Sequence, residues 1–203
     1  MDLNLEQLVN QSLKLYLKFG IRSVSMDDIA RKLTISKKTV YQLVKDKDDL
    51  VTRCIELIST QMDMSQLAKN TNMNMIEKHI HIYKHISRII MEINPSFEYD
   101  LKKYYPMQFK LFINNRRDHI FNEMQADLVQ GIEEGYFRKD IDIKKVSILN
   151  ILRIESLKTT DILEKYNMRL IDLIDELFVY HLHAIASPMG LIEFEKLQKP
   201  FKN

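Results

Sequence analysis

The sequence has few residues that interrupt regular structure or cross-link it. Four glycines and four prolines occur among 203 residues, which favours long helices over turn-rich sheets. The single cysteine, Cys54, excludes an intrachain disulfide. No apolar run approaches the length of a membrane span, and residues 1–6 lack the basic start and apolar run of a secretory signal. We therefore expect a cytoplasmic protein that does not associate with membranes.

Catalytic and metal-binding motifs are also missing. The sequence contains no glycine-rich phosphate loop, no nucleophile motif and no convincing pair of catalytic carboxylates. His81 and His85 are spaced to share a metal on a helix, with Glu77 one turn earlier. No cysteine or dense carboxylate cluster joins them, so a surface or core role is favoured. We expect a protein that is not an enzyme and has no metal or cofactor, with a small helical enzyme as a weaker alternative.

Apolar residues make up 45% of the chain and charged residues 29%, the balance of an ordinary globular protein. The net charge is only +2, yet four lysines gather within residues 37–47: Lys37, Lys38, Lys45 and Lys47. Such a local basic cluster suits binding to phosphates. The alternative is a solvated basic face, and the choice depends on the pattern around it.

Apolar residues spaced at three and four positions predict helices along most of the chain. The first is expected over residues 5–19, ended by Gly20 in a left-handed conformation. Three further helices follow, each after a good N-cap: Ser25, Ser36 and Asp46. A tight turn at Thr34 and Ile35 separates the second from the third, an arrangement typical of a helix-turn-helix.

Longer helices are predicted in the rest of the sequence. Their expected ranges are 75–93, 97–104, 107–134, 143–157 and 163–186, followed by a tail after Pro188. Proline and glycine residues mark most of the breaks between them.

The segment from Gly20 to Leu50 carries the most specific pattern. It combines the glycine-led turn, an Ile29-Ala30 pair, the serine-capped third helix with its tyrosine, and a lysine that opens the fourth helix. This pattern resembles the DNA-binding domain of the TetR family of transcriptional regulators. The resemblance implies an all-α protein with an N-terminal three-helix helix-turn-helix domain, residues 1–47. A larger helical domain for ligand binding and dimerisation would follow in residues 48–203.

A recognition helix needs polar side chains on its outward N-terminal face to reach base edges in the major groove. The third helix offers four of them, and the resemblance adds two residues that match phosphate-contacting positions, Tyr41 and Lys47. The predicted DNA-binding residues are Ser25, Ser36, Lys37, Lys38, Thr39, Tyr41, Gln42 and Lys47. The capping and turn pattern makes the alternative of a merely solvated basic face the weaker one.

The sequence departs from the family pattern at two positions. Thr34 stands where the family usually has glycine, so a non-glycine residue is expected to form the turn at some strain. Leu43 replaces the usual aromatic residue or histidine, which removes one expected phosphate contact. Neither change is expected to prevent the fold.

Methionine and aromatic residues are concentrated in the middle of the chain and can line an adaptable apolar pocket. The TetR resemblance implies such a pocket, in which a ligand shifts two DNA-reading heads. The candidate ligand-binding residues are Met62, Met91, Tyr104, Tyr105, Phe109 and Phe112. The alternative is a plain helical core.

The function predicted from the sequence is that of a ligand-responsive transcriptional regulator. We expect a repressor that binds double-stranded DNA at a palindromic operator as a homodimer, and that a small apolar or aromatic effector releases. The resemblance places the dimer contact on the last two long helices, residues 143–157 and 163–186. The alternative is a ligand-independent helix-turn-helix protein, DNA-binding or architectural, without a sensing pocket.

Overall fold

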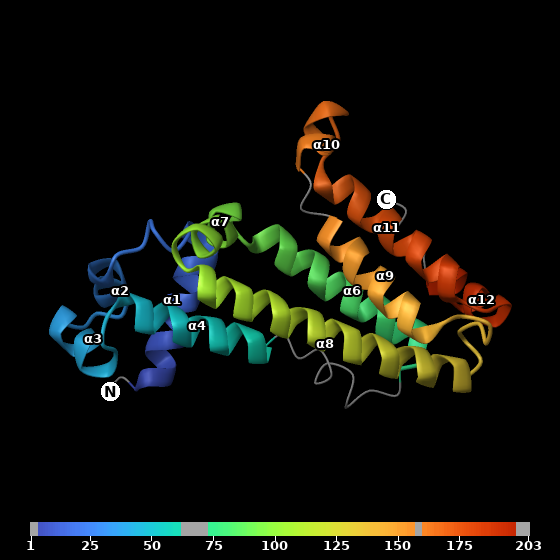
Figure 1. Ribbon diagram of the computed structural model, residues 1–203, viewed down its shortest axis with the longest axis horizontal. Helices are drawn as coiled ribbons and strands as arrows, with labels where there is room; N and C mark the ends of the chain where they lie inside the picture. The colour runs from blue at the N-terminus through green and yellow to red at the C-terminus, as the bar shows by residue number, and fades with distance from the viewer. Residues whose placement is uncertain (1–3, 62–72, 157–159, 198–203) are drawn as a thin grey trace. The chain divides into compact units, whose positions relative to one another are not determined.

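The computed structural model describes residues 4–61, 73–156 and 160–197. Helices dominate these residues (Figure 1), and the pairing of extended backbone among them is an isolated antiparallel bridge between Phe137 and Ala186. The all-α fold class is confirmed. The helices are α1 Leu5–Phe19, α2 Met26–Lys32, α3 Lys37–Leu43, α4 Lys47–Gln61, α6 Met75–Glu92, α7 Pro95–Tyr104, α8 Pro106–Glu133, α9 Ile143–Ser156, α10 Thr160–Lys165, α11 Leu170–Ile185 and α12 Pro188–Leu197. Within the described ranges, none of them is both long and apolar enough to span a bilayer.

The chain divides into two compact units. Unit 1 comprises residues 1–63 and 89–116, and unit 2 comprises residues 64–88 and 117–203. The functional division into residues 1–47 and 48–203 remains a prediction, because it concerns which residues contact DNA and which bind ligand.

α1 spans the residues that its sequence predicts, but Gly20 after it combines a φ of +84° with a ψ of 156°, which is not the predicted left-handed helical cap. Asn4 and Gln7 form a capping box, in which the Asn4 side chain accepts the Gln7 N–H at 2.8 Å and the Gln7 side chain accepts the Asn4 N–H at 3.3 Å. The helix ends at Gly20, whose φ is +84° and whose N–H donates to the Tyr16 carbonyl at 2.9 Å. Glycine adopts a positive φ without a steric penalty, and a Cβ at this position would lie 3.0 Å from the Cβ of Ser96.

The core of unit 1 joins the N-terminal helices to α7 and the first turns of α8. Asn94 connects α7 to the end of α1: its N–H donates to the Leu17 carbonyl at 2.8 Å and its side chain to the Lys18 carbonyl at 3.1 Å. The same side chain caps α7 by accepting the Ser96 N–H at 2.8 Å. Fully buried apolar side chains of this core include Leu8, Tyr16, Ile21, Ile29, Val40, Leu50 and Leu101.

Unit 2 corrects two sequence predictions near the C-terminus. Residues 163–186 are not one helix, because Asn167 takes a φ of +51° and separates α10 from α11. Asparagine tolerates this conformation better than most residues. The expected tail after Pro188 is instead α12, since proline is well tolerated at the first helical position. The Ser187 hydroxyl accepts the Gly190 N–H at 3.1 Å, and Phe194 is fully buried in the core of the unit.

Candidate DNA-binding surface

Serine side chains set the starts of both helices of the helix-turn-helix. The Ser25 hydroxyl accepts the Asp28 N–H at 3.1 Å, and the Asp28 carboxylate accepts the Ser25 N–H at 3.0 Å and its hydroxyl at 2.6 Å. These hydrogen bonds from Ser25 lower the pKa of Asp28. Ser36 caps α3 by accepting the Thr39 N–H at 3.0 Å. Both predicted caps are confirmed, while direct contacts of Ser25 and Ser36 with DNA remain predictions.

The turn between α2 and α3 is closed by a Schellman motif with threonine in the position that glycine normally fills. The Ile35 N–H donates to the Ala30 carbonyl at 3.0 Å, and the Thr34 N–H donates to the Arg31 carbonyl at 3.2 Å. Thr34 has a φ of +58°, and its side chain is exposed. The turn is therefore formed by a β-branched residue in a left-handed conformation, as the departure from the family pattern predicted.

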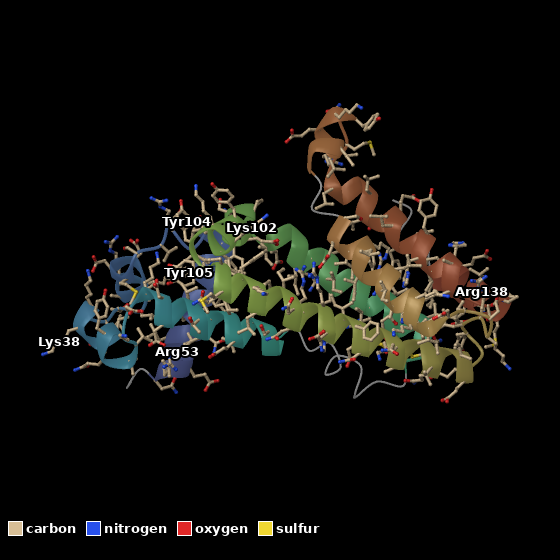
Figure 2. All side chains as sticks on the ribbon, viewed as in Figure 1. Lys38, Arg53, Lys102, Tyr104, Tyr105 and Arg138 are labelled. Carbon is tan, nitrogen blue, oxygen red and sulfur yellow. The ribbon has the colours of Figure 1, made fainter. Side chains whose placement is uncertain are left out.

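α3 separates an exposed polar face from a buried apolar one. Val40 is fully buried and Val44, directly after the helix, is 3% exposed, so both pack into the core of unit 1. On the opposite side Lys38, Tyr41 and Gln42 are exposed, and Figure 2 shows the Lys38 side chain at the outer edge of α3. This face is free to approach a groove of DNA.

Lys37 belongs to the same face but is not unpaired. Its ammonium donates to the Asp27 carboxylate on α2 at 3.1 Å, and this contact raises the pKa of Lys37. Both side chains are about half exposed. An exposed ion pair of this kind is weak, so a phosphate can displace the carboxylate and take its place.

The ammonium of Lys47 is hydrogen-bonded within the protein, unlike that of a lysine that only contacts phosphate. Its ammonium donates to the carbonyls of Ile21 and Val24 at 2.7 and 2.6 Å, which closes the connection between α1 and α2. Burial lowers the pKa of Lys47. Two of the three ammonium donors are thus engaged within the protein. The predicted phosphate contact of Lys47 would use the third donor or the N-terminal amides of α4.

The structure adds a contact that the sequence analysis missed. The Arg22 N–H donates to the buried carboxylate of Asp100 on α7 at 2.8 Å. The Arg22 guanidinium lies 4.8 Å from the ring centre of Tyr104 and donates to its hydroxyl. These partners are about 80 residues apart along the chain, so no local sequence pattern predicts that they pair. α7 thus braces the backbone that leads into the helix-turn-helix.

The predicted ligand-binding residues do not form one group among the described side chains. Met62 and the side chain of Met91 lie outside the described residues. Tyr104 is 41% exposed beside Arg22. Tyr105, Phe109 and Phe112 pack with the core of unit 1, and burial together with Asp48 raises the pKa of Tyr105 to about 12. Their role in ligand binding remains a prediction.

An open hollow of about 460 Å³ lies on unit 1, between α1 and α4. Its lining residues are Leu5, Glu6, Val9, Arg53, Glu56 and Leu57. None of the predicted ligand-binding residues contributes to it.

The segment that forms this surface is similar to a known family. Residues 8–54 match the family of bacterial regulatory proteins described as the tetR family. No curated protein matches the chain by sequence. The match covers α1, α2, α3 and the first half of α4, the elements that form the helix-turn-helix and its support.

Solved structures share the fold over nearly the whole chain. A transcriptional regulator from Cytophaga hutchinsonii has a TM-score of 0.71 at 16% identity, covering 90% of this chain and 98% of that one. A protein from Saccharomonospora viridis in complex with choline has a TM-score of 0.67 at 15% identity, covering 90% and 97%. The transcriptional regulator FadR from Bacillus subtilis, in complex with stearoyl-CoA, has a TM-score of 0.58 at 17% identity, covering 87% and 97%. At these identities the likeness establishes the fold.

Proposed function

We propose that this tetR-family regulatory protein is a transcriptional repressor that binds a palindromic operator as a homodimer and leaves it when a small effector binds. The observation that carries the proposal is the exposed N-terminal face of α3, held by the Ser36 cap and the Schellman turn. An exposed, capped helix after a tight turn is the element that helix-turn-helix proteins insert into the major groove.

Residues of α3 divide between two kinds of contact. Lys38 and Gln42 are exposed on the outer face, and their long polar side chains suit hydrogen bonding to guanine and adenine edges. Tyr41, 45% exposed, and Lys37 suit phosphate contacts, which position the protein on the duplex. The Thr39 hydroxyl already lies 2.8 Å from that of Ser36, so it supports the cap as well as facing the groove.

A homodimer is supported by apolar side chains that unit 2 leaves exposed. On α9, Ile148, Leu149 and Leu152 are 43%, 62% and 56% exposed. On α11, Tyr180 is 70% exposed. Apolar side chains exposed together on successive turns of α9 mark an interaction site, and a twofold partner would cover them. One recognition helix reads few base pairs, whereas a dimer reads two half-sites about one helical turn apart.

Control by an effector is supported by the solved relatives, two of which hold choline and stearoyl-CoA. In this proposal, the effector binds in the larger helical domain and favours a dimer whose two α3 helices are wrongly spaced for DNA. α4 begins at Lys47, directly after the helix-turn-helix, and continues toward that domain in sequence. It is therefore the helix that transmits the change.

The test is fluorescence anisotropy on duplex fragments from upstream of the protein's own gene, at two salt concentrations. Saturable binding of one dimer to one fragment, weakened steeply by salt, is the expected result. Equal and weak binding to every fragment would contradict a specific repressor.

The variant Lys37→Ala plus Lys38→Ala should lose this binding while keeping its helical circular dichroism. Lys144→Ala plus Lys145→Ala is a matched control, because these adjacent exposed lysines also open a helix and Lys145 also pairs with an aspartate, Asp142, at 3.0 Å. The control should bind like the wild type. Equal losses in both variants would mean that general positive charge, and not the α3 face, attracts DNA.

A further inference from the structure

α9 exposes several apolar side chains and buries two polar ones, although Lys144 and Lys145 are also exposed and Val146 packs against the core of unit 2. Its exposed side carries Ile148, Leu149 and Leu152. Its inner side carries polar residues: Ser147 is fully buried and Asn150 is 8% exposed. Polar side chains are buried at a cost unless they have hydrogen-bonding work to do. The Ser147 hydroxyl meets this need within its own helix by donating to the Ile143 carbonyl at 2.8 Å, whereas the Asn150 side chain accepts a hydrogen bond from Arg153.

Arg153 extends this polar side toward α11. One terminal nitrogen of its guanidinium donates to the Asn150 side chain at 2.7 Å, and the other lies 3.5 Å from the Leu177 carbonyl on α11. The Nε–H is buried, and it has no hydrogen-bond partner among the residues that the structure describes. Burial lowers the pKa of Arg153 to about 10. Arg153 is half-buried, so its guanidinium is largely but not fully desolvated, and the acceptors that hold it among the described residues are neutral.

Other charged groups in the interior of unit 2 have partners within the chain. Lys78 on α6 pairs with the buried Asp127 on α8, which also lies 3.4 Å from His79. The Tyr83 hydroxyl donates to Asp175. In the part of unit 2 that the structure describes, no carboxylate lies within ion-pair distance of Arg153. A largely desolvated cation without a nearby anion is unfavourable, so this guanidinium is suited to accept an anion from outside the chain.

The groups near Arg153 fit an organic anion. Burial lowers the pKa of His181 on α11, and the charge of Arg153 lowers it further, so His181 is neutral and can donate or accept a hydrogen bond. The Tyr83 ring stacks on Phe178 at 4.2 Å, which gives this interior an apolar wall. A guanidinium binds a planar carboxylate through two parallel N–H groups, and the Nε–H is the donor left over for one of them.

We propose that Arg153, supported by Asn150, binds the carboxylate of a small organic acid inside unit 2, and that this acid is the effector. Only the identification of this acid as the effector rests on the proposed function, because binding of the acid is measured without DNA. The apolar or aromatic effector predicted from the sequence would then carry a charged carboxylate at one end. The carboxylate neutralises the guanidinium, so bound and free forms of unit 2 differ in the packing of α9 against α11.

Binding is tested by differential scanning fluorimetry and calorimetry with straight-chain carboxylates from butanoate to decanoate, each compared with its own neutral amide. The expected result is that at least one carboxylate raises the Tm of the wild type and its amide does not. In Arg153→Met the affinity should fall by about 30-fold or more, because a buried charged pair is lost. If no carboxylate binds, or if the amides bind equally well, the proposal is wrong.

A second measurement separates a binding role from a structural one. Without ligand, Arg153→Met should keep or raise the Tm, by roughly 2–4 °C, because it removes a desolvated charge with no partner. A fall in Tm, or weaker dimerisation in analytical ultracentrifugation, would assign Arg153 to the fold or to the dimer and overturn the proposal.

The matched control is Arg117→Met. This arginine of the same unit donates to both oxygens of Glu155, at 2.7 and 2.8 Å, so its charge is already neutralised. It should leave carboxylate binding unchanged and should not raise the Tm. If the wild-type protein binds a carboxylate but no DNA fragment specifically, only the proposed function is contradicted. If it binds DNA specifically but no carboxylate, only this inference is contradicted.

Discussion

Replacing Thr34 by glycine should stabilise the protein. Thr34 holds a φ of +58°, where the Cβ of an L-residue approaches its own backbone. This conformation costs a non-glycine residue about 1–2 kcal/mol, whereas glycine loses about 0.5–1 kcal/mol more backbone entropy on folding. The side chain is exposed, so no packing is lost. Thr34→Gly should therefore raise the free energy of unfolding by about 0.5–1 kcal/mol.

The assay is urea denaturation followed by circular dichroism, with the midpoint and the slope fitted separately. An increase in midpoint at constant slope is the expected result. Asn167→Gly is the matched control: Asn167 also has a positive φ, +51°, but asparagine tolerates it better. It should gain less than Thr34→Gly. A lower midpoint for Thr34→Gly would refute the strain argument and show that threonine stabilises the turn.

Three further predictions concern packing, a buried carboxylate and pH. Gly190→Ala should lower stability by about 1–3 kcal/mol in urea denaturation, because its Cβ would lie 2.1 Å from the backbone oxygen of Tyr136; an unchanged midpoint would contradict this packing. Asp100→Ala should cost about 1–3 kcal/mol by the same assay, since it leaves a backbone N–H of the α1–α2 connection unpaired; a neutral result would mean that water replaces the carboxylate. Ser25→Ala should lose most stability at neutral pH: the folded pKa of Asp28 is lowered, so its contribution is complete above the ordinary value of 3.8 and disappears as the pH falls through the lowered value. A difference from the wild type that stays constant between pH 7 and pH 3 would contradict this.

Short-range interactions explain what the sequence predicted correctly. The caps by Ser25 and Ser36, and the end of α1 at Gly20, each depend on backbone groups within four residues. Such patterns can be recognised in the sequence because a serine hydroxyl or a flexible glycine acts on its immediate neighbours. The strained turn at Thr34 was predictable for the same reason.

Two errors near the C-terminus show the limit of local patterns. The apolar periodicity of residues 163–186 continues through Asn167, so the sequence alone does not show that this residue takes a positive φ. Pro188 predicts the start of a tail when it is considered only as a residue that ends helices, although proline also begins them. Burial of Phe194 in the core of unit 2 decides in favour of α12.

The helical class, the helix-turn-helix and the residues on the outer face of α3 could all be predicted from the amino-acid sequence. Three features depend on the folded chain: Lys47 closes the α1–α2 connection, Asp100 holds Arg22, and the half-buried Arg153 has no carboxylate beside it among the described residues. The physical reason is that a capping or turn interaction is fixed by neighbours along the chain. The energy of a buried charge instead depends on which distant groups the fold brings within a few ångströms of it.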